Sequence, residues 1–430
     1  MLESRPASLF RCLLSAFALV AALSLPAAPR ASEASQTPAT PRVAPVAREV
    51  RALWVLRSSL TSPEQISRLV RDARSSGFNT LLVQVRGRGD AYFNQGLEPL
   101  PPALANKPDS FDPLAQVVSA GHAAGLRVHA WVNVNLVASA TLLPKSPAHL
   151  IKAHPEWLMV PRQLARELHG IAPSHPSYVA ALAAWTRRHA GQVEGLFSSP
   201  VPVEAARHVE AIVSDLARRY ALDGVHLDYI RYPSPDFDYS RAALAAFRES
   251  VIKDLSATER LVLDRRLVRE PFVYVDKYPQ RWTTFRRARL TDLVARIRQA
   301  VKAHRPNAIL SAAVIADANE AAIHRLQDWQ DWSARGLLDV ICPMAYTADM
   351  KRFSRTVADA TRFAAPQPLW AGIGAFKIPS TQTVAHIRAA RAAGAEGIAL
   401  FSYDSLMGPS LSTIGRAAFG DAGLPVASSR

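Results

Sequence analysis

The chain has 430 residues, of which 49% are hydrophobic and 20% charged, and this is the composition of an ordinary globular protein with a large core. Its net charge is +15, but the arginines are dispersed along expected helices, with no basic run interleaved with aromatic residues. The sequence shows no nucleic-acid motif, and we expect no nucleic-acid partner. The charge leaves open an anionic polysaccharide or a membrane surface as partner, although a solvated basic surface is the simpler interpretation.

The first residues have the pattern of an export signal. Arg5 and Arg11 accompany the apolar run CLLSAFALVAALSL, and a stretch of small residues follows it. The run is short for a bilayer span, which makes an uncleaved anchor the weaker alternative. Cys12 lies within the run rather than after it, unlike the cysteine of a lipoprotein. We predict a signal peptide at 1–34 and a disordered linker at 35–47, and hence a periplasmic or secreted protein without stable membrane insertion.

From Val50 onward, short apolar runs alternate with helical patterns. The predicted strands lie at 50–56, 79–87, 126–134, 223–233, 308–315, 337–346, 368–376 and 396–404. Helical patterns occupy 62–77, 111–125, 204–221, 350–364 and 380–394, and a further helix passes through Trp329 and Trp332. The stretch 234–307 predicts at least two more helices, whereas 136 to about 202 is predicted to be irregular.

The eight strands are apolar along nearly their whole length, which favours a parallel sheet with both faces buried. Strands that alternate with helices in this way predict an α/β fold, a (β/α)8 TIM barrel, with an extended loop after strand 3 and a helical insertion after strand 4. A doubly wound open sheet is the alternative, but VLRSSLTSPEQ after the first strand lacks the glycine-rich turn of that fold. We predict one barrel domain at 48–420 and a flexible tail at 421–430.

Polar residues at the carboxyl ends of the strands mark the candidate site, because TIM barrels carry their active sites there. In DGVHLDYIRYP (223–233), the apolar set Val225, Leu227 and Tyr229 suits the helix-facing side, so His226 and Asp228 point into the barrel. The same alternation brings four further side chains to the mouth: Arg86, Asn133, Tyr346 and Asp404. A buried carboxylate is costly unless it is paired or used, and we therefore favour a functional role for Asp228.

Several of these residues have a structural alternative. Arg86 could be the structural partner of Asp228, and Asp404 could equally be a helix cap. We expect Asp223 to act in a turn, His226 to be a hydrogen-bonded core residue, and Cys342 to be a buried hydrophobe. Three aromatic residues of the long loop could stack on sugars but more commonly fill a core: Trp157, Tyr178 and Trp185.

A series of motifs resembles those of the glycosyl-hydrolase-like family 10 proteins. The motifs are VQVRGRGDAYF, FDPLAQVVSAGHAAGLRVHAWVNV, HPEW, DGVHLDYIRYP, PMAYTAD and GIALFSYD, and the likeness spans about residues 48–408. The resemblance implies an exported bacterial (β/α)8 barrel and a glycoside hydrolase of the cell envelope, distantly related to the deacetylase/hydrolase partners of exopolysaccharide export. The partner it implies is a polysaccharide or oligosaccharide substrate.

The fourth strand also resembles that of the chitinase-like family 18 glycosidases, whose pattern is Asp-Gly-x-Asp-x-Asp-x-Glu. Asp223, Gly224 and Asp228 match this pattern, but His226 stands at the middle acid and Ile230 at the final one. The final acid is the proton donor of that family. The comparison therefore argues against substrate-assisted cleavage and leaves Asp228 to serve in another role or as the acid itself.

Glycoside cleavage normally uses two carboxyl groups, one to protonate the leaving oxygen and one to act as nucleophile or base. We predict that Asp228 is the first and Asp404 the second, with Asp317 and Asp349 as further candidates. The residues expected to hold sugar hydroxyls or to tune the acid are Arg86, Asn133, Arg231 and Tyr346.

Two other functions stay open. The barrel could bind envelope glycan without cutting it, since no motif fixes a second carboxylate. A metal-dependent hydrolase or deacetylase is less well supported, because four histidines of the long loop lack metal-ligand spacing: His149, His154, His169 and His175. We accordingly expect no metal and no cofactor.

Overall fold

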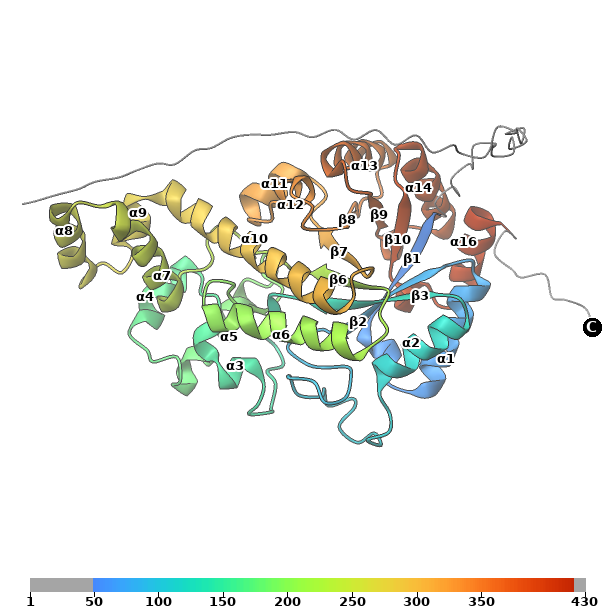
Figure 1. The fold of residues 1–430 in the computed structure, drawn as a ribbon, viewed down its shortest axis with the longest axis horizontal. Coiled ribbons are helices and arrows are strands. Elements are labelled where there is room, and N and C mark those ends of the chain that lie inside the picture. The colour runs from blue at the N-terminus through green and yellow to red at the C-terminus, as the bar shows by residue number, and fades with distance from the viewer. Residues whose placement is uncertain (1–48, 421–430) are drawn as a thin grey trace, which may run out of the picture. The chain divides into compact units, whose positions relative to one another are not determined.

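The computed structural model describes residues 49–420, so the predicted signal peptide, linker and tail lie outside the described residues. Eight parallel strands form its central sheet (Figure 1). They are β1 Val50–Val55, β2 Thr80–Arg86, β3 Arg127–Asn133, β6 Gly224–Asp228, β7 Ile309–Val314, β8 Val340–Pro343, β9 Trp370–Ile373 and β10 Gly397–Phe401. Each lies within one of the eight ranges predicted from the sequence.

The sheet closes on itself into a barrel. Its strand order is β8-β7-β6-β3-β2-β1-β10-β9, and parallel bridges from Ile341 to Leu369 and from Met344 to Gly372 join the two ends. Gly372 permits this closure, because a Cβ there would lie 2.7 Å from the carbonyl oxygen of Pro343. The predicted TIM barrel is therefore confirmed, and the open doubly wound sheet is wrong.

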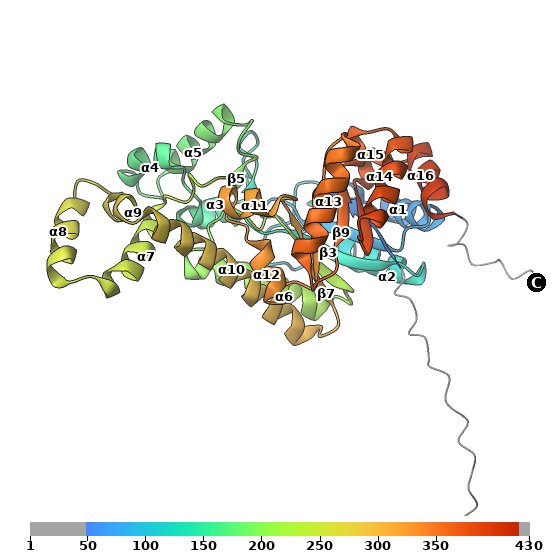
Figure 2. The ribbon, with the colours of Figure 1, turned by 90° about the horizontal axis from the view of Figure 1, so that it is seen from above.

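Helices that follow the strands in the chain cover the outside of the barrel (Figures 1 and 2). They are α1 Pro63–Ser75, α2 Pro113–Ala123, α6 Val203–Arg219, α10 Pro279–His304, α11 Ala318–His324, α12 Trp329–Ala334, α13 Met350–Ala364, α14 Ser380–Ala392, α15 Tyr403–Leu406 and α16 Pro409–Phe419. The start of α1 follows its sequence signal, since the Ser62 hydroxyl accepts the N–H of Gln65 at 3.3 Å. Asp112 caps α2 in the same way, at 3.0 Å from the N–H of Ala115.

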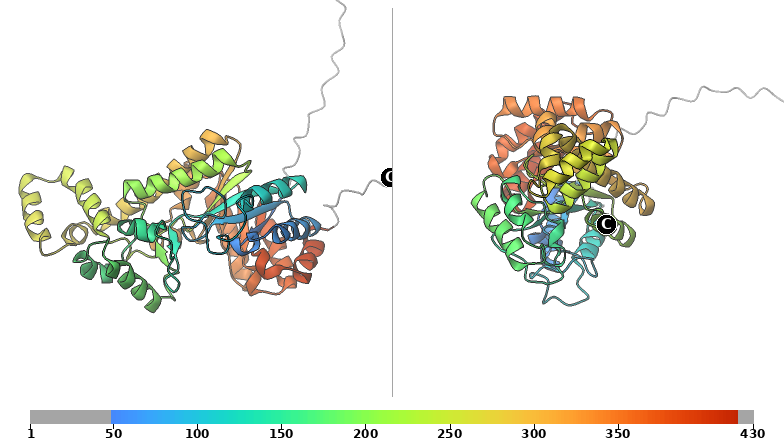
Figure 3. Two further views of the ribbon diagram at one scale, coloured as in Figure 1. Left: turned by 90° about the horizontal axis from the view of Figure 1, so that it is seen from below. Right: turned by 90° about the vertical axis from the view of Figure 1, so that its left-hand side faces the viewer.

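Two insertions interrupt the barrel pattern. The one after β3 contains β4 Leu136–Ala138, α3 Leu150–Ala153, α4 Arg162–His169, α5 Pro176–Arg188 and β5 Leu196–Phe197, so the prediction of an irregular stretch is wrong. Most of its elements are short and gain their order from packing, as β4 does by pairing antiparallel with β5. The one after β6 contains α7 Arg241–Val251, α8 Ala257–Leu267 and α9 Val273–Lys277, which lie together at the end away from α16 (Figures 1 and 3).

The core has two parts, as side-chain alternation along the strands requires. A small cluster fills the barrel interior: Val50, Ala52, Trp54, Leu82, Trp131, Ala313, Val340, Cys342, Trp370 and Ala399. The opposite strand faces, Val225 and Leu227 among them, pack against the helices in a much larger cluster. Among residues 49–420, no helix is both long enough and apolar enough to cross a membrane.

Candidate active site

Asp228 ends β6 inside the barrel, as predicted. It pairs in register with Asn133 at the end of β3, and its side chain is only 7% exposed. One carboxylate oxygen accepts the N–H of Tyr229 at 2.7 Å. Burial raises the pKa of Asp228 from 3.8 to about 6, although the charge of Arg231, the Tyr229 N–H and the nearby indole of Trp131 favour the ionised form. A carboxyl group with this pKa can hold a proton close to neutral pH.

Tyr229 departs from the strand alternation. Its φ is +50°, a left-handed value that is strained for a residue with a large side chain. The regular strand therefore ends at Asp228, and Tyr229 packs beside Phe197 of β5 against the same large cluster as Val225 and Leu227. The guanidinium of Arg231 lies over the Tyr229 ring, 4.2 Å from its centre. Burial and the neighbouring Asp228 raise the pKa of Tyr229 to about 12, so its hydroxyl stays protonated.

A second carboxylate, Glu194, reaches the same place from the loop before β5. It accepts from Nη2 of Arg231 at 2.8 Å, and its side chain is 38% exposed. Its negative charge contributes to the raised pKa of Asp228. The two remaining nitrogen positions of Arg231, Nε and Nη1, are buried without a hydrogen-bond partner among the described residues. Arg231 thus pairs directly with Glu194 and lies close enough to Asp228 for its charge to affect the pKa of that carboxyl.

Tyr346 completes the surroundings of Asp228. Burial first, and then the charge of Asp228, raise the pKa of Tyr346 well above its ordinary value. Its ring lies edge-on to Trp54 at 6.4 Å. A pocket of about 290 Å³ opens beside it at the ends of β7 and β8, lined in part by Glu320 and Arg352. The predicted residues Asn133, Asp228, Arg231 and Tyr346 are therefore brought together.

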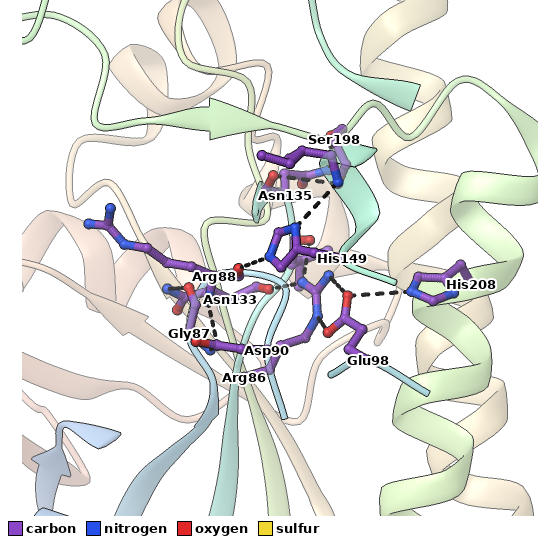
Figure 4. Close-up of polar contacts among 12 residues, drawn as sticks. Arg86, Gly87, Arg88, Asp90, Glu98, Asn133, Asn135, His149, Ser198 and His208 are labelled. Carbon is purple, nitrogen blue, oxygen red and sulfur yellow. Dashed lines mark hydrogen bonds and ion pairs between the residues drawn. The ribbon is translucent and has the colours of Figure 1, made fainter. Parts of the chain in front are cut away.

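Arg86 has a different place from the predicted one. The pairing of β2 with β3 shifts register between Gln84 and Arg86, so the alternation fails at the end of β2. Arg86 forms a bidentate pair with Glu98, at 2.7 and 2.6 Å, and donates to the carbonyl oxygens of Asn133 and Val134 (Figure 4). It is fully buried and its donors are occupied by protein groups, so we assign it a structural role in place of sugar binding.

The Arg86 pair belongs to a network that shapes the loop after β2 (Figure 4). Nδ2 of Asn133 donates to the carbonyl of Gly87 at 2.8 Å, and Oδ1 of Asp90 accepts the N–H groups of Gly87 and Arg88. Nε2 of the buried His149 donates to the carbonyl of Arg88 at 2.8 Å. The backbone from 87 to 90 is thus held by Asp90 within the loop and by Asn133 and His149 from elsewhere in the fold.

Asp404 lies across the barrel mouth from β6, at the end of β10. Its Oδ2 accepts the N–H of Leu56 at 2.8 Å, and its Oδ1 accepts the hydroxyls of Ser58 and Ser59 at 3.1 and 2.7 Å. It therefore anchors the turn after β1 without capping a helix, since Ser402 is the N-cap of α15 and the turn Arg57–Leu60 has no side-chain cap. The two further candidates do cap helices: Asp317 accepts the N–H of Glu320, and Asp349 that of Arg352.

The expected structural residues take structural roles. His226 accepts from the indole N–H of Trp54 at 2.9 Å and bonds Ser311 at 2.9 Å, and burial lowers its pKa to about 3, which keeps it neutral. Asp223 accepts the N–H of Val128 at 2.8 Å at the start of β6. The loop aromatics and the thiol are all buried in the core: Trp157, Tyr178, Trp185 and Cys342.

The family model described as Glycosyl hydrolase-like 10 matches residues 49–384, which include the whole of the site described above except Asp404. The chain belongs to this family. One stretch of 202 residues is also 26% identical to the Glycosyl hydrolase YngK of Bacillus subtilis (strain 168). That match covers 43% of this chain and 34% of the other protein, so the chain spans about a third of that relative's length.

Solved structures of glycoside hydrolases share the barrel of this Glycosyl hydrolase-like 10 chain. The glycoside hydrolase domain of PgaB (BpsB) from Bordetella bronchiseptica has a TM-score of 0.59 at 15% identity, covering 86% of this chain and 99% of that one. The catalytic domain of a β-amylase from Paenibacillus polymyxa has a TM-score of 0.56 at 12% identity, covering 88% and 100%. The β-galactosidase Gan42B of G. stearothermophilus has a TM-score of 0.57 at 15% identity, covering 87% and 57%. At these identities the likeness shows the fold.

The raised pKa of Asp228 predicts a pH-dependent cost to stability. The native carboxyl binds more protons than the unfolded one between pH 3.8 and about 6, so this contribution to stability falls as the pH rises through that window. The full cost above pH 6 is about 3 kcal/mol. We expect Asp228→Asn to raise the free energy of unfolding by up to that amount at pH 7.5 and by little at pH 4. Urea denaturation at both pH values measures this; an equal loss of stability at both would contradict it.

Proposed function

We propose that the protein is a glycoside hydrolase of a cell-envelope or extracellular polysaccharide, with Asp228 as its general acid. The observation that carries the proposal is a buried carboxyl with a pKa of about 6 at the mouth of a barrel whose family is glycosyl hydrolase-like. An acid with this pKa can protonate the departing glycosidic oxygen near neutral pH. Asn133 and Tyr346 lie beside it as hydrogen-bonding groups, and the pocket next to Tyr346 offers room for a neighbouring sugar.

Glu194 is the second carboxyl in this proposal, in place of Asp404. It pairs with Arg231 at 2.8 Å, and it lies close enough to Asp228 to affect the pKa of that residue. Asp228 is buried whereas Glu194 is 38% exposed, and two carboxyls in such different environments suit one as acid and the other as nucleophile or base. Asp228 then gives its proton to the leaving oxygen, while Glu194 attacks the anomeric carbon or removes a proton from the attacking water. The anomer of the first product distinguishes these two routes.

Glu194→Gln tests that assignment. We expect the substitution to lower kcat by about 100-fold or more, because the amide can neither attack nor accept a proton. The matched control is Glu210→Gln, since Glu210 pairs with Arg296 and is 37% exposed, close to the 38% of Glu194. The control should keep wild-type kcat. Equal rates for Glu194→Gln and wild type would remove Glu194 from the reaction.

The second candidate is a glycan-binding protein without hydrolytic activity. It is favoured by one observation, that Arg231 already engages Glu194, the proposed second carboxyl, at 2.8 Å. Incubation with fractionated envelope polysaccharides separates the two functions. A hydrolase releases new reducing ends, whereas a binding protein retains the glycan unchanged. Export to the periplasm or beyond belongs to the same proposal and rests on the amino-terminal sequence pattern.

A further inference from the structure

Two arginines at the barrel mouth take no part in the acid pair. Arg57 lies two residues after the end of β1 and begins the turn Arg57–Leu60, and Arg88 lies two residues after the end of β2. Both are partly buried. Among residues 49–420, neither has a carboxylate within 4.0 Å of its guanidinium, unlike the neighbouring Arg86 and Arg231, which pair with Glu98 and Glu194.

Arg57 is held in a fixed position. Its Nη1 donates to Oε1 of Gln84 at 2.7 Å, and its guanidinium lies directly against Gly87. A Cβ at position 87 would be 2.6 Å from that Nη1, so the guanidinium packs closely against the loop backbone at Gly87. The hydroxyl of Tyr92 is a further neighbour. Such a guanidinium is ordered before any ligand arrives, which lowers the entropic cost of binding.

Arg88 presents its guanidinium without a partner. The group forms no hydrogen bond with any described residue, and Figure 4 shows its side chain extending away from the Arg86 network. Burial and the charge of Arg57 lower the pKa of Arg88, so the two cations lie close enough to repel each other. Asp90 and Tyr229 partly oppose this repulsion, but Oδ1 of Asp90 is occupied by the N–H groups of Gly87 and Arg88.

We propose that Arg57 and Arg88 form a subsite for an anionic group beside Asp228, and that the glycan recognised there carries a carboxylate. Tyr229 connects the two places, because it follows Asp228 in the chain and neighbours Arg88. A carboxylate matches the planar donor pattern of guanidinium groups and neutralises two cations that otherwise repel. The inference rests on the proposed function for the glycan, and it deepens that function by naming the substrate class.

The test compares acidic glycans with their own neutral forms. The probes are oligogalacturonate, hyaluronan oligosaccharides and envelope polysaccharide fractions, each before and after chemical reduction of the carboxylates to alcohols. Binding is measured by calorimetry. We expect at least one acidic probe to bind about 10-fold or more tightly than its reduced form, and this preference to weaken with added salt.

Arg88→Gln should lower affinity for the acidic probe by about 10- to 100-fold and change affinity for the reduced probe by less than about 2-fold. The matched control is Arg127→Gln, because Arg127 is also half-buried and without an ion pair among the described residues but lies at the opposite end of the barrel. Arg127→Gln should change the affinity for neither probe. The Arg88 guanidinium donates no hydrogen bond within the described fold, so its replacement leaves the fold intact.

Each outcome decides a separate question. Three results would overturn the anionic subsite. The first is equal affinity for the acidic and reduced probes, and the second is no binding of any carboxylated probe. The third is an equal loss of affinity for both probe forms in Arg88→Gln. Hydrolysis of a neutral glycan that needs Asp228 but not Arg88 would overturn the subsite and leave the proposed hydrolase standing. Arg88-dependent binding of an acidic glycan without new reducing ends would support the subsite and overturn hydrolysis.

Discussion

Asp228→Asn is expected to lower kcat/KM for a cleaved glycan by about 100- to 10,000-fold, the range in which a positioned general acid contributes. The asparagine can still accept the N–H of Tyr229, which Asp228 accepts at 2.7 Å, so the local backbone keeps its support. It has no proton to give to the leaving oxygen. Release of new reducing ends, compared between the variant and wild type at pH 5.5, measures the effect.

The matched control for this prediction is Asp404→Asn. Asp404 was the other acid expected from the sequence, but its two oxygens accept from Leu56, Ser58 and Ser59. We expect Asp404→Asn to lose some stability and to keep a rate within a few-fold of wild type. Two results would contradict the assignment of Asp228 as the general acid. One is wild-type activity in Asp228→Asn, and the other is a loss of activity in Asp404→Asn as large as the one expected of Asp228→Asn. We expect Asp228→Asn to be more stable than wild type at pH 7.5 and to lose activity. This combination would mark Asp228 as a residue kept for function at the expense of stability.

The largest expected loss of stability is that of Glu98→Gln, about 3–5 kcal/mol in the free energy of unfolding. Glu98 and Arg86 are 4% and 1% exposed at the side chain and form a bidentate pair. The amide would leave the buried guanidinium of Arg86 without a countercharge. Urea denaturation at pH 7 measures the loss, and Glu210→Gln, which breaks a partly exposed pair, should cost less than about 1 kcal/mol.

The contribution of Glu98 also has a defined pH dependence. Burial alone would raise its pKa, but attraction to Arg86 and hydrogen bonds from His208 and Arg86 outweigh burial and lower the pKa to about 2. The stabilisation is therefore fully present above pH 4.5 and is lost as the pH falls toward 2. The difference between wild type and Glu98→Gln should narrow in that window. A difference that is small at pH 7 would show that the pair contributes little to the fold.

Much of the barrel could be predicted from sequence because its signals are local. Apolar runs of strand length, Ser62 and Asp112 at helix starts, and glycines at helix ends fix the order of elements without reference to tertiary contacts. The insertion after β3 could not be predicted in this way. Its strands β4 and β5 are three and two residues long, and they pair only because the chain between them folds back.

The candidate site was predictable only where strand alternation holds. Asp228 and Asn133 lie on regular strands and point where the pattern places them. Arg86 does not, because the β2–β3 register shifts just before it. The left-handed φ of +50° at Tyr229, which ends the regular strand, is likewise not visible in the alternation. Glu194 lies in a loop with no periodic signal, so only its contact with Arg231 brings it to the site.

Asp404 shows the opposite error, because the sequence predicts it as a catalytic residue and the structure gives it structural contacts. Its position at a strand end suggests chemistry, whereas its partner Ser59 is 345 residues away in the chain and cannot be inferred from spacing. The same holds for Arg57 and Arg88, which meet only because β1 and β2 are neighbours in the sheet.

The pH profile of glycan cleavage tests the central claim most directly. Wild-type protein is incubated with fractionated envelope polysaccharides from pH 4 to 8, and new reducing ends are counted. If Asp228 donates the proton, kcat/KM should fall about tenfold for each pH unit above its pKa of about 6. A rate that stays constant or rises from pH 6 to 8, or tightly bound glycan from which no reducing end is released at any pH, would contradict the assignment.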